Sequence, residues 1–289
     1  MIKKRLCFVN WVFVLVVSIC LTQPVYAGDE CTAVYGRGNN TFSLATGSPG
    51  ELGMLKAIAE VFNSKNDTSL CWRKAGSGKS LQLLKEKKVD MVMVHAPAAE
   101  KQAVNEGWAI KRQLIGSNEF YIVGPKDDPA NIANAKTAAV AYVKIAKTQA
   151  IFFSRGDNSG THKKEMAIWK QASIQPAGNW YKVTKTFMMA TLKQANDQNG
   201  YFMTDSSTWV AGKKEMNNLK ILFRGDPFLI NTYHTLCQPQ GTTSGQPYAV
   251  KFIDFVISEE GQSLIRSYGT KEHGEGLYND AAYAKQYDH

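Results

Sequence analysis

The chain has 289 residues and a formal net charge of +9. Its lysines and arginines are scattered, and neither an RNP-like pattern nor a zinc-finger pattern occurs, so we expect no nucleic-acid partner. The length suits one large domain or two domains of medium size.

Residues 1–27 are predicted to be a secretory signal peptide that is not part of the fold. A basic start at residues 3–5 precedes the apolar stretch 6–21, and residues 25–27 end in a small residue that suits cleavage. The apolar stretch contains polar residues and is short for a membrane span. We therefore expect a soluble periplasmic or extracellular protein that begins near Gly28. Its formal charge falls from +9 to +6, an excess that favours small anionic partners.

Three cysteines remain in the exported chain, namely Cys31, Cys71 and Cys237. An oxidising compartment makes one disulfide plausible, and three pairings are open. We favour Cys31–Cys71 because both residues flank neighbouring predicted strands near the start. We do not expect Cys20 to be lipidated, since Ile19 before it is a poor fit to the small residue usual there.

Strands and helices alternate along the first part of the chain. Strands are predicted at 42–45, 70–72, 89–94 and 120–125, with helices over 49–62, around 81–84 and from 99 to 104. Ser48 is predicted to be the N-cap of the first helix and Pro49 its first helical residue.

After a turn at 127–129 the alternation restarts. Helices are predicted at about 133–146, 161–172, 187–195, 206–211, 248–257 and 261–268, with strands at 151–153, 201–203, 219–223 and 231–237. This order predicts two α/β domains with mainly parallel sheets, whose ligands bind beyond the carboxyl ends of the strands.

The third of three strand–loop–helix junctions carries the strongest signal for an anion. It reads Ser154-Arg155-Gly156-Asp157-Asn158-Ser159-Gly160-Thr161-His162-Lys163-Lys164-Glu165. Free backbone N–H groups at a helix start attract anions, and Arg155 adds a fork of donors while Ser159 and Thr161 add hydroxyl groups. A surface turn whose serine and aspartate only cap a helix is the alternative interpretation.

The other two junctions also offer hydroxyl groups, from Thr46 and Ser48 and from Ser77. Gly78-Lys79-Ser80 resembles the end of a phosphate-binding P-loop, but Arg73 stands where that motif needs a glycine, so we expect no nucleotide.

Catalysis needs a nucleophile with its base, or a set of metal ligands, and the sequence offers neither. The nucleophile motif Gly-x-Ser-x-Gly and the zinc motif His-Glu-x-x-His do not occur, and the five histidines are scattered. His162 is interpreted as a solvated helix-start histidine and His95 as a satisfied polar group at a sheet edge. We therefore expect no enzyme activity, cofactor or metal.

The third junction, together with Asp90–Pro97 and Phe120–Lys126, resembles the extracellular tungstate-binding protein family, the substrate-binding component of tungstate and molybdate ABC importers. The similarity continues through Ala190–Leu192, Tyr201–Asp205 and Gly225–Pro227. The resemblance implies a two-lobed periplasmic binding protein. Lobe I comprises 28–118 and 236–289, lobe II comprises 119–235, and crossovers near 118–124 and 230–238 form the hinge.

By this resemblance, Arg155 and Thr161 match the family's oxyanion-binding arginine and threonine. Thr46, Ser48 and Ser77 match hydroxyl positions of its first two loops. Two further hydroxyl positions of the family's first loop are taken by Gly47 and Pro49, a departure that leaves the choice of oxyanion open.

The resemblance implies a monomeric protein that captures tungstate or molybdate for a membrane permease. Sulfate, phosphate and a small carboxylate are the competing ligands. A surface adhesin on the same scaffold and an exported enzyme acting on phosphate or sulfate esters are the competing functions. Arg-Gly-Asp, a cell-adhesion tripeptide, occurs at 155–157 and at 224–226, but such tripeptides recur by chance too often to count.

Overall fold

The computed structural model describes residues 31–288, and these form an α/β protein around one mixed sheet. The described strands are β1 (Ala33–Tyr35), β2 (Asn40–Thr46), β3 (Thr68–Lys74), β4 (Met91–Val94), β5 (Ile110–Pro125), β6 (Phe152–Ser154), β7 (Tyr181–Val183), β8 (Tyr201–Asp205), β9 (Leu219–Phe223), β10 (Ile230–Cys237) and β11 (Asn279–Asp280). They run in the order β1-β3-β2-β4-β10-β5-β8-β6-β7, with β9 and β11 also paired to β5.

Helices lie between most of these strands. The described α-helices are α1 (Ser48–Glu51), α2 (Met54–Asn66), α3 (Ser77–Lys85), α4 (Pro97–Asn105), α5 (Ala138–Thr148), α6 (Gly160–Gln171), α7 (Met188–Asp197), α8 (Ser206–Gly212), α9 (Gln246–Ile257), α10 (Glu259–Ser267), α11 (Thr270–His273) and α12 (Ala281–Ala284). Short 3₁₀ turns are η1 (Ile132–Asn134), η2 (Lys213–Glu215), η3 (Pro227–Leu229) and η4 (Lys285–Tyr287). No helix in the described part of the chain is both long and apolar enough to cross a membrane.

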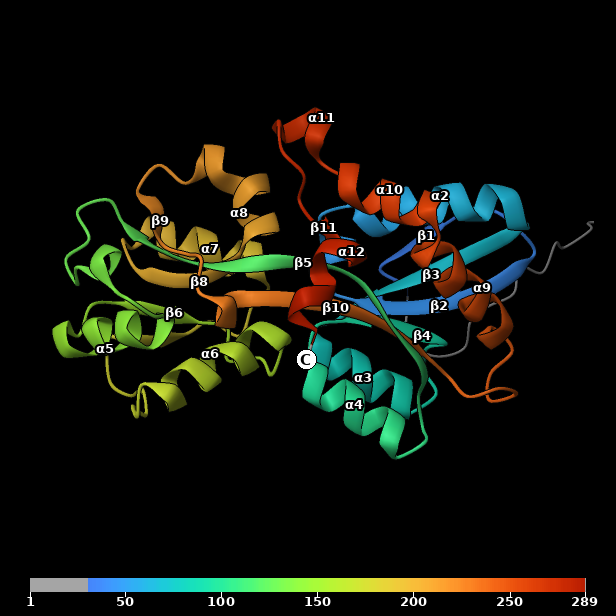
Figure 1. Cartoon of the computed structure of the whole chain (residues 1–289), viewed down its shortest axis with the longest axis horizontal. Helices are drawn as coiled ribbons and strands as arrows, with labels where there is room; N and C mark the ends of the chain where they lie inside the picture. The colour runs from blue at the N-terminus through green and yellow to red at the C-terminus, as the bar shows by residue number, and fades with distance from the viewer. Residues whose placement is uncertain (1–30, 289) are drawn as a thin grey trace, which may run out of the picture. The chain divides into compact units, whose positions relative to one another are not determined.

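Two strands, β5 and β10, join the halves of the sheet. They pair antiparallel through Ile230↔Glu119 and Asn231↔Asn118, and Figure 1 shows them running between a group that contains β6 and β8 and a group that contains β2 and β3. The sheet is therefore mixed, whereas mainly parallel sheets were predicted. The sequence prediction found only 120–125 of β5 because residues 111–119 are mostly polar and lack an apolar alternation.

Each half of the sheet has its own hydrophobic core. In one, Trp169 packs 4.3 Å from Tyr142 and 5.2 Å from Phe152, measured between ring centroids, and the buried members of this core come from residues 120–229. In the other, Phe252 of α9 lies 5.4 Å from Phe42 and 5.1 Å from Phe62. Burying one such aromatic ring contributes about 1.5–3 kcal/mol. We use lobe I and lobe II below for the ranges predicted from the sequence, a division that remains a proposal.

Two helix starts differ from the sequence prediction for identifiable reasons. Gly47, and not Ser48, is the N-cap of α1, and the predicted helix over 49–62 is broken at Gly53, whose φ of 88° is accessible to glycine. The helix predicted from 133 begins only after Thr137, whose side chain accepts a hydrogen bond from the backbone N–H of Val140 at 3.2 Å.

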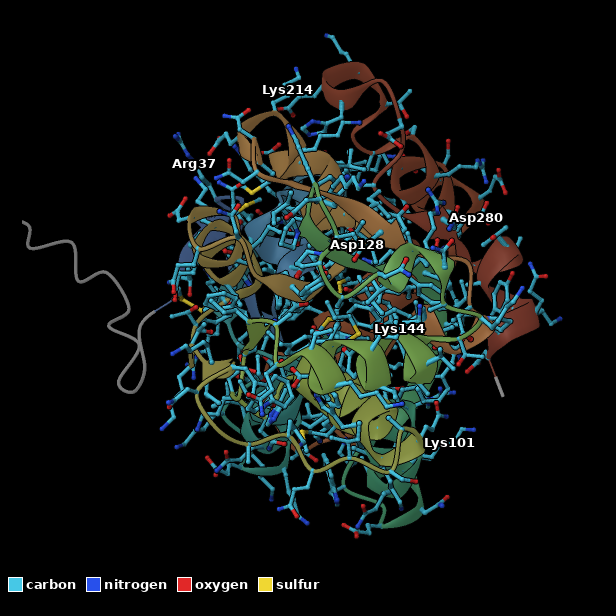
Figure 2. All side chains as sticks on the ribbon, turned by 90° about the vertical axis from the view of Figure 1, so that its left-hand side faces the viewer. Arg37, Lys101, Asp128, Lys144, Lys214 and Asp280 are labelled. Atoms are coloured by element: carbon cyan, nitrogen blue, oxygen red, sulfur yellow. A yellow bond between two sulfur atoms is a disulfide. The ribbon has the colours of Figure 1, made fainter. Side chains whose placement is uncertain are left out.

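The predicted disulfide is confirmed. Cys31 and Cys71 are bonded, with their Cα atoms 5.4 Å apart, and Cys237 is a buried free thiol. The predicted signal peptide, residue Cys20 included, lies outside the described residues. Exposed cations such as Arg37, Lys101 and Lys214 lie far apart on the surface (Figure 2), as their scatter in the sequence predicts.

Candidate functional site

The loops that follow β2, β3 and β6 meet at one place between the halves of the sheet. A methyl group on Gly76, after β3, would lie 2.9 Å from Cβ of Ser159, after β6, and one on Gly78 would lie 2.5 Å from the carbonyl oxygen of Asn158. A methyl group on Gly47, after β2, would lie 3.3 Å from the carbonyl oxygen of Ala75. The three junctions singled out in the sequence therefore contact one another, and the junction after β3 contacts the junction after β6 in the other predicted lobe.

Arg155 lies where these loops meet, and some of its guanidinium N–H donors have no acceptor among the described residues. It is 4% exposed, its Nε donates to the carbonyl oxygen of Thr186 at 3.2 Å, and Nη2 donates to Asp157 Oδ2 at 2.6 Å. A guanidinium group has five N–H donors. The hydrogen bonds formed with the described residues use two of them, so up to three remain for a ligand.

Thr161, in the first turn of α6, presents an unsatisfied hydroxyl group. The residue is 1% exposed, and Oγ1 has no hydrogen-bond partner among the described residues. A buried polar group without a partner destabilises a protein by about 1–3 kcal/mol. A bound acceptor such as an oxyanion would remove that penalty.

Two predicted hydroxyl groups keep their own protons free to donate. Ser77 Oγ accepts from the backbone N–H of His95 at 3.1 Å, and Ser159 Oγ accepts from the backbone N–H of His162 at 3.3 Å as the N-cap of α6. Both serines are buried at the starts of helices α3 and α6, where the helix dipoles favour negative charge.

The two predicted hydroxyl groups of the first loop donate within the protein instead. Thr46 Oγ1 donates to the carbonyl oxygen of Met93 at 2.8 Å, and Ser48 Oγ donates to Asp205 Oδ2 at 3.4 Å. Each hydroxyl group has a single proton. Thr46 therefore braces the end of β2 against β4 in this structure, and Ser48 connects lobe I with lobe II.

The two histidines near the loops are kept neutral. Burial, assisted by the charge of Arg155, lowers the pKa of His95 to about 3, and its Nδ1 lies 2.8 Å from Asn231 Oδ1. Burial also lowers the pKa of His162, whose Nδ1 accepts from the backbone N–H of Asn158 at 3.0 Å. Neither ring therefore adds a positive charge to the loops near neutral pH.

Sequence reasoning missed three residues at this site. Asp205 is the last residue of β8 and is 1% exposed, and burial raises the pKa of its carboxyl group. The ring of Phe187 lies close to two cations, with Lys74 Nζ 4.2 Å and the guanidinium carbon of Arg155 5.5 Å from the ring centroid. Of the three, only Asp205 carried a usable signal, because it stands just beyond the strand predicted at 201–203.

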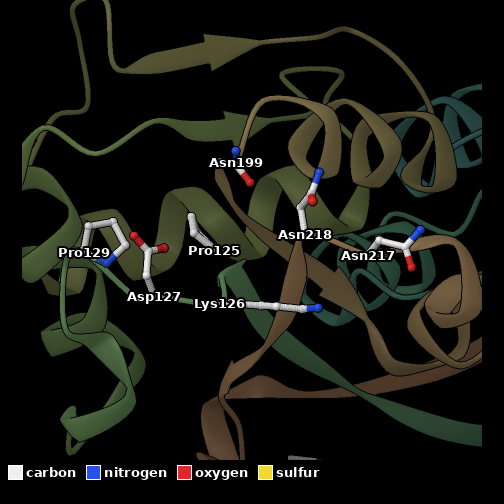
Figure 3. A pocket seen from close by; sticks show the side chains of 7 residues that line it. All are labelled: Pro125, Lys126, Asp127, Pro129, Asn199, Asn217 and Asn218. Atoms are coloured by element: carbon white, nitrogen blue, oxygen red, sulfur yellow. The ribbon is translucent and has the colours of Figure 1, made fainter.

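A separate hollow is lined by none of the residues of these loops. It has a volume of about 410 Å³ and is lined by Pro125, Lys126, Asp127, Pro129, Asn199, Asn217 and Asn218. Figure 3 shows the amide side chains of Asn199, Asn217 and Asn218 on one side and the turn after β5 on the other. None of the predicted oxyanion-binding residues lines it.

A family model described as the PBP superfamily domain matches residues 33–260. The chain belongs to the PBP superfamily. It is 29% identical to the tungstate-binding protein TupA of Peptoclostridium acidaminophilum, over 97% of this chain and 99% of that protein.

Two solved structures of similar proteins extend the match to three dimensions. One is described as the tungstate ABC transporter from Geobacter sulfurreducens, with 36% identity, a TM-score of 0.72, and coverage of 80% of this chain and 100% of that chain. The other is the tungstate-binding protein TupA from Desulfovibrio alaskensis, with 34% identity, a TM-score of 0.69, and coverage of 83% and 98%. The family resemblance and the PBP-like α/β fold predicted from the sequence are thereby confirmed.

Proposed function

We propose that this protein captures one tungstate or molybdate ion between its lobes and delivers it to the permease of an ABC importer. The observation that carries the proposal is the unsatisfied hydroxyl group of Thr161 in the same junction as a buried Arg155 that retains free donors. The starts of α3 and α6 add the donors of Ser77 and Ser159. A fully ionised tetrahedral dianion needs many donors and no acceptor, and this arrangement supplies them.

The same proposal covers the protein's setting. It is a monomeric, non-enzymatic binding protein, exported by the segment 1–27 to the periplasm or the cell exterior. Its similarity to three proteins described as tungstate-binding proteins or tungstate transporters supports tungstate as the cargo. The proposed oxyanion-binding residues are Thr46, Ser48, Ser77, Arg155, Ser159 and Thr161. Thr46 and Ser48 can donate to the anion only after they release their present acceptors.

A calorimetric screen of the exported chain tests this function. Tungstate, molybdate, sulfate, phosphate and citrate are titrated separately. We expect one tungstate or molybdate per chain and a raised melting temperature, because a ligand at a thousandfold excess over its Kd stabilises the native state by about 4 kcal/mol. Binding of phosphate or citrate alone would refute the proposal.

The chain supplies a matched control for that screen. Arg224-Gly225-Asp226 repeats the tripeptide at 155–157, but the Arg224 side chain is 58% exposed and its guanidinium carbon lies 4.7 Å from the ring centroid of Tyr121. Arg224→Ala should bind tungstate like the unmodified protein. Equal loss of binding in Arg224→Ala and Arg155→Ala would indicate a general effect of charge and not a site at Arg155.

A further inference from the structure

The carboxyl group of Asp205 lies among the proposed donors, where a negative charge would oppose an anion. Its Oδ1 accepts from the backbone N–H of Thr208 at 2.7 Å, which is the ordinary bond of a helix N-cap. Its Oδ2 accepts from Thr208 Oγ1 at 3.1 Å and from Ser48 Oγ at 3.4 Å. The helix cap explains the bond to Oδ1. Oδ2, in contrast, accepts from Ser48, a proposed oxyanion-binding residue of the opposite lobe.

Burial is the largest influence on the Asp205 carboxyl group and raises its pKa. Hydrogen bonds from Thr208 and Ser207, and then the positive charge of Arg155, lower it. The hydroxyl groups of Ser207 and Thr208 face it from α8, and Tyr233 on β10 and Tyr278 before β11 are close enough to feel its charge. Burial raises the pKa of both tyrosines, which therefore stay neutral.

A bound dianion would repel the negatively charged carboxylate of Asp205. Arg155 already donates to Asp157 Oδ2. A dianion that takes its remaining donors adds two negative charges near the Asp205 carboxylate, in a site from which water is largely excluded. Like charges at short range favour the neutral form of a carboxyl group.

We propose that Asp205 takes up one proton from the buffer when a tungstate dianion binds, and so makes binding depend on pH. The inference rests on the proposed function. The proton goes to the Asp205 carboxyl group, which changes from charge −1 to neutral and then offers an O–H donor to the anion. Ser48, which loses a charged acceptor, becomes free to turn toward the anion as well.

Thermodynamic linkage fixes the sign and limit of the effect. If binding takes up a proton, the affinity falls as the pH rises, by at most tenfold per pH unit for one proton. We expect the Kd for tungstate to rise with pH near neutrality, with a slope that approaches this limit. Glu165 also titrates near this range because burial raises its pKa to about 7, so the assignment requires a variant.

The variant is Asp205→Asn, which keeps an oxygen that can cap α8 and removes the titrating group. Calorimetry of tungstate binding in two buffers of different ionisation enthalpy counts the protons taken up. We expect uptake of up to one proton by the unmodified protein near pH 7. In Asp205→Asn we expect no uptake, a Kd that is flat with pH, and binding at about pH 8 at least tenfold tighter than in the unmodified protein.

Asp226→Asn is the matched control. Asp226 also belongs to lobe II and caps a turn. It accepts from the backbone N–H groups of Phe228 and Ala138, each at 2.9 Å, and from none of the proposed oxyanion-binding residues. Asp226→Asn should take up as many protons on tungstate binding as the unmodified protein does. Tungstate binding without proton uptake, or uptake that persists in Asp205→Asn, would overturn this inference alone, whereas no tungstate binding at all would overturn it together with the proposed function.

Discussion

Replacing Arg155 by alanine should abolish most of the affinity for tungstate. The structure leaves up to three of its five N–H donors for a ligand, since Thr186 and Asp157 occupy the other two. A hydrogen bond to a charged group contributes about 1.5–3 kcal/mol. Loss of two such bonds therefore removes about 3–6 kcal/mol, and each 1.4 kcal/mol is tenfold in Kd. The Kd should rise by at least about a hundredfold.

Arg155→Lys separates charge from geometry in the same experiment. Lysine keeps the positive charge but loses the planar fork that donates to Thr186 and to Asp157 at once. We expect it to recover only part of the lost affinity. Arg224→Ala, which removes an exposed arginine of the same lobe, should leave the Kd unchanged.

The assay must distinguish binding from bracing, because a buried arginine also supports its own loop. Isothermal titration calorimetry gives the Kd, and the melting temperature without ligand reports the fold. A variant that melts close to the unmodified protein but has lost tungstate supports the binding role. An Arg155→Ala protein that keeps the unmodified Kd would refute the reasoning, whatever its melting temperature.

Three further predictions concern closure, acid–base balance and the disulfide. The loops of the two lobes already touch in this closed arrangement, and the proposed oxyanion-binding residues come from both lobes, so tungstate should favour it over more open arrangements and reduce the radius of gyration measured by small-angle scattering. An unchanged profile at saturation would contradict rigid-lobe closure. Burial raises the pKa of Glu165 from 4.5 to about 7, so the stability that its protonated form contributes is fully present below about pH 4.5 and is lost as the pH rises through 7. Urea unfolding should therefore show Glu165→Gln gaining up to about 3 kcal/mol relative to the unmodified protein between about pH 5 and pH 8. A difference in unfolding free energy that does not change with pH would contradict this. Replacing Cys31 and Cys71 by serine opens a loop of sequence separation 40 and should lower the unfolding free energy by about 4 kcal/mol in the chain-entropy model, with a loss under about 1 kcal/mol counting against it.

The parts of the site that lie within one junction could be predicted from the sequence. Arg155, Ser159 and Thr161 follow a short apolar strand and open a helix, so local pattern places all three at a helix start. The alternation of strands and helices likewise predicts an α/β fold with sites at strand ends. Local pattern suffices here because each feature depends on residues a few positions apart.

Contacts between the lobes could not be predicted in the same way. The bond of Ser48 to Asp205 joins residues 157 positions apart, and the approach of Lys74 to Phe187 also joins the two lobes. No local periodicity encodes which strand ends meet. The donation of Thr46 to the carbonyl oxygen of Met93 similarly depends on the neighbouring strand, so the sequence identified the hydroxyl group but not its use.

Anomalous X-ray diffraction from crystals of the protein with tungstate tests the central claim most directly, because tungsten marks its own position. We predict a single tungsten peak per chain, within hydrogen-bonding reach of the Arg155 guanidinium group and Thr161 Oγ1 through the anion's oxygens. A peak at the hollow lined by Asn199 and Asn218, or no peak in crystals grown at a saturating tungstate concentration, would contradict the account.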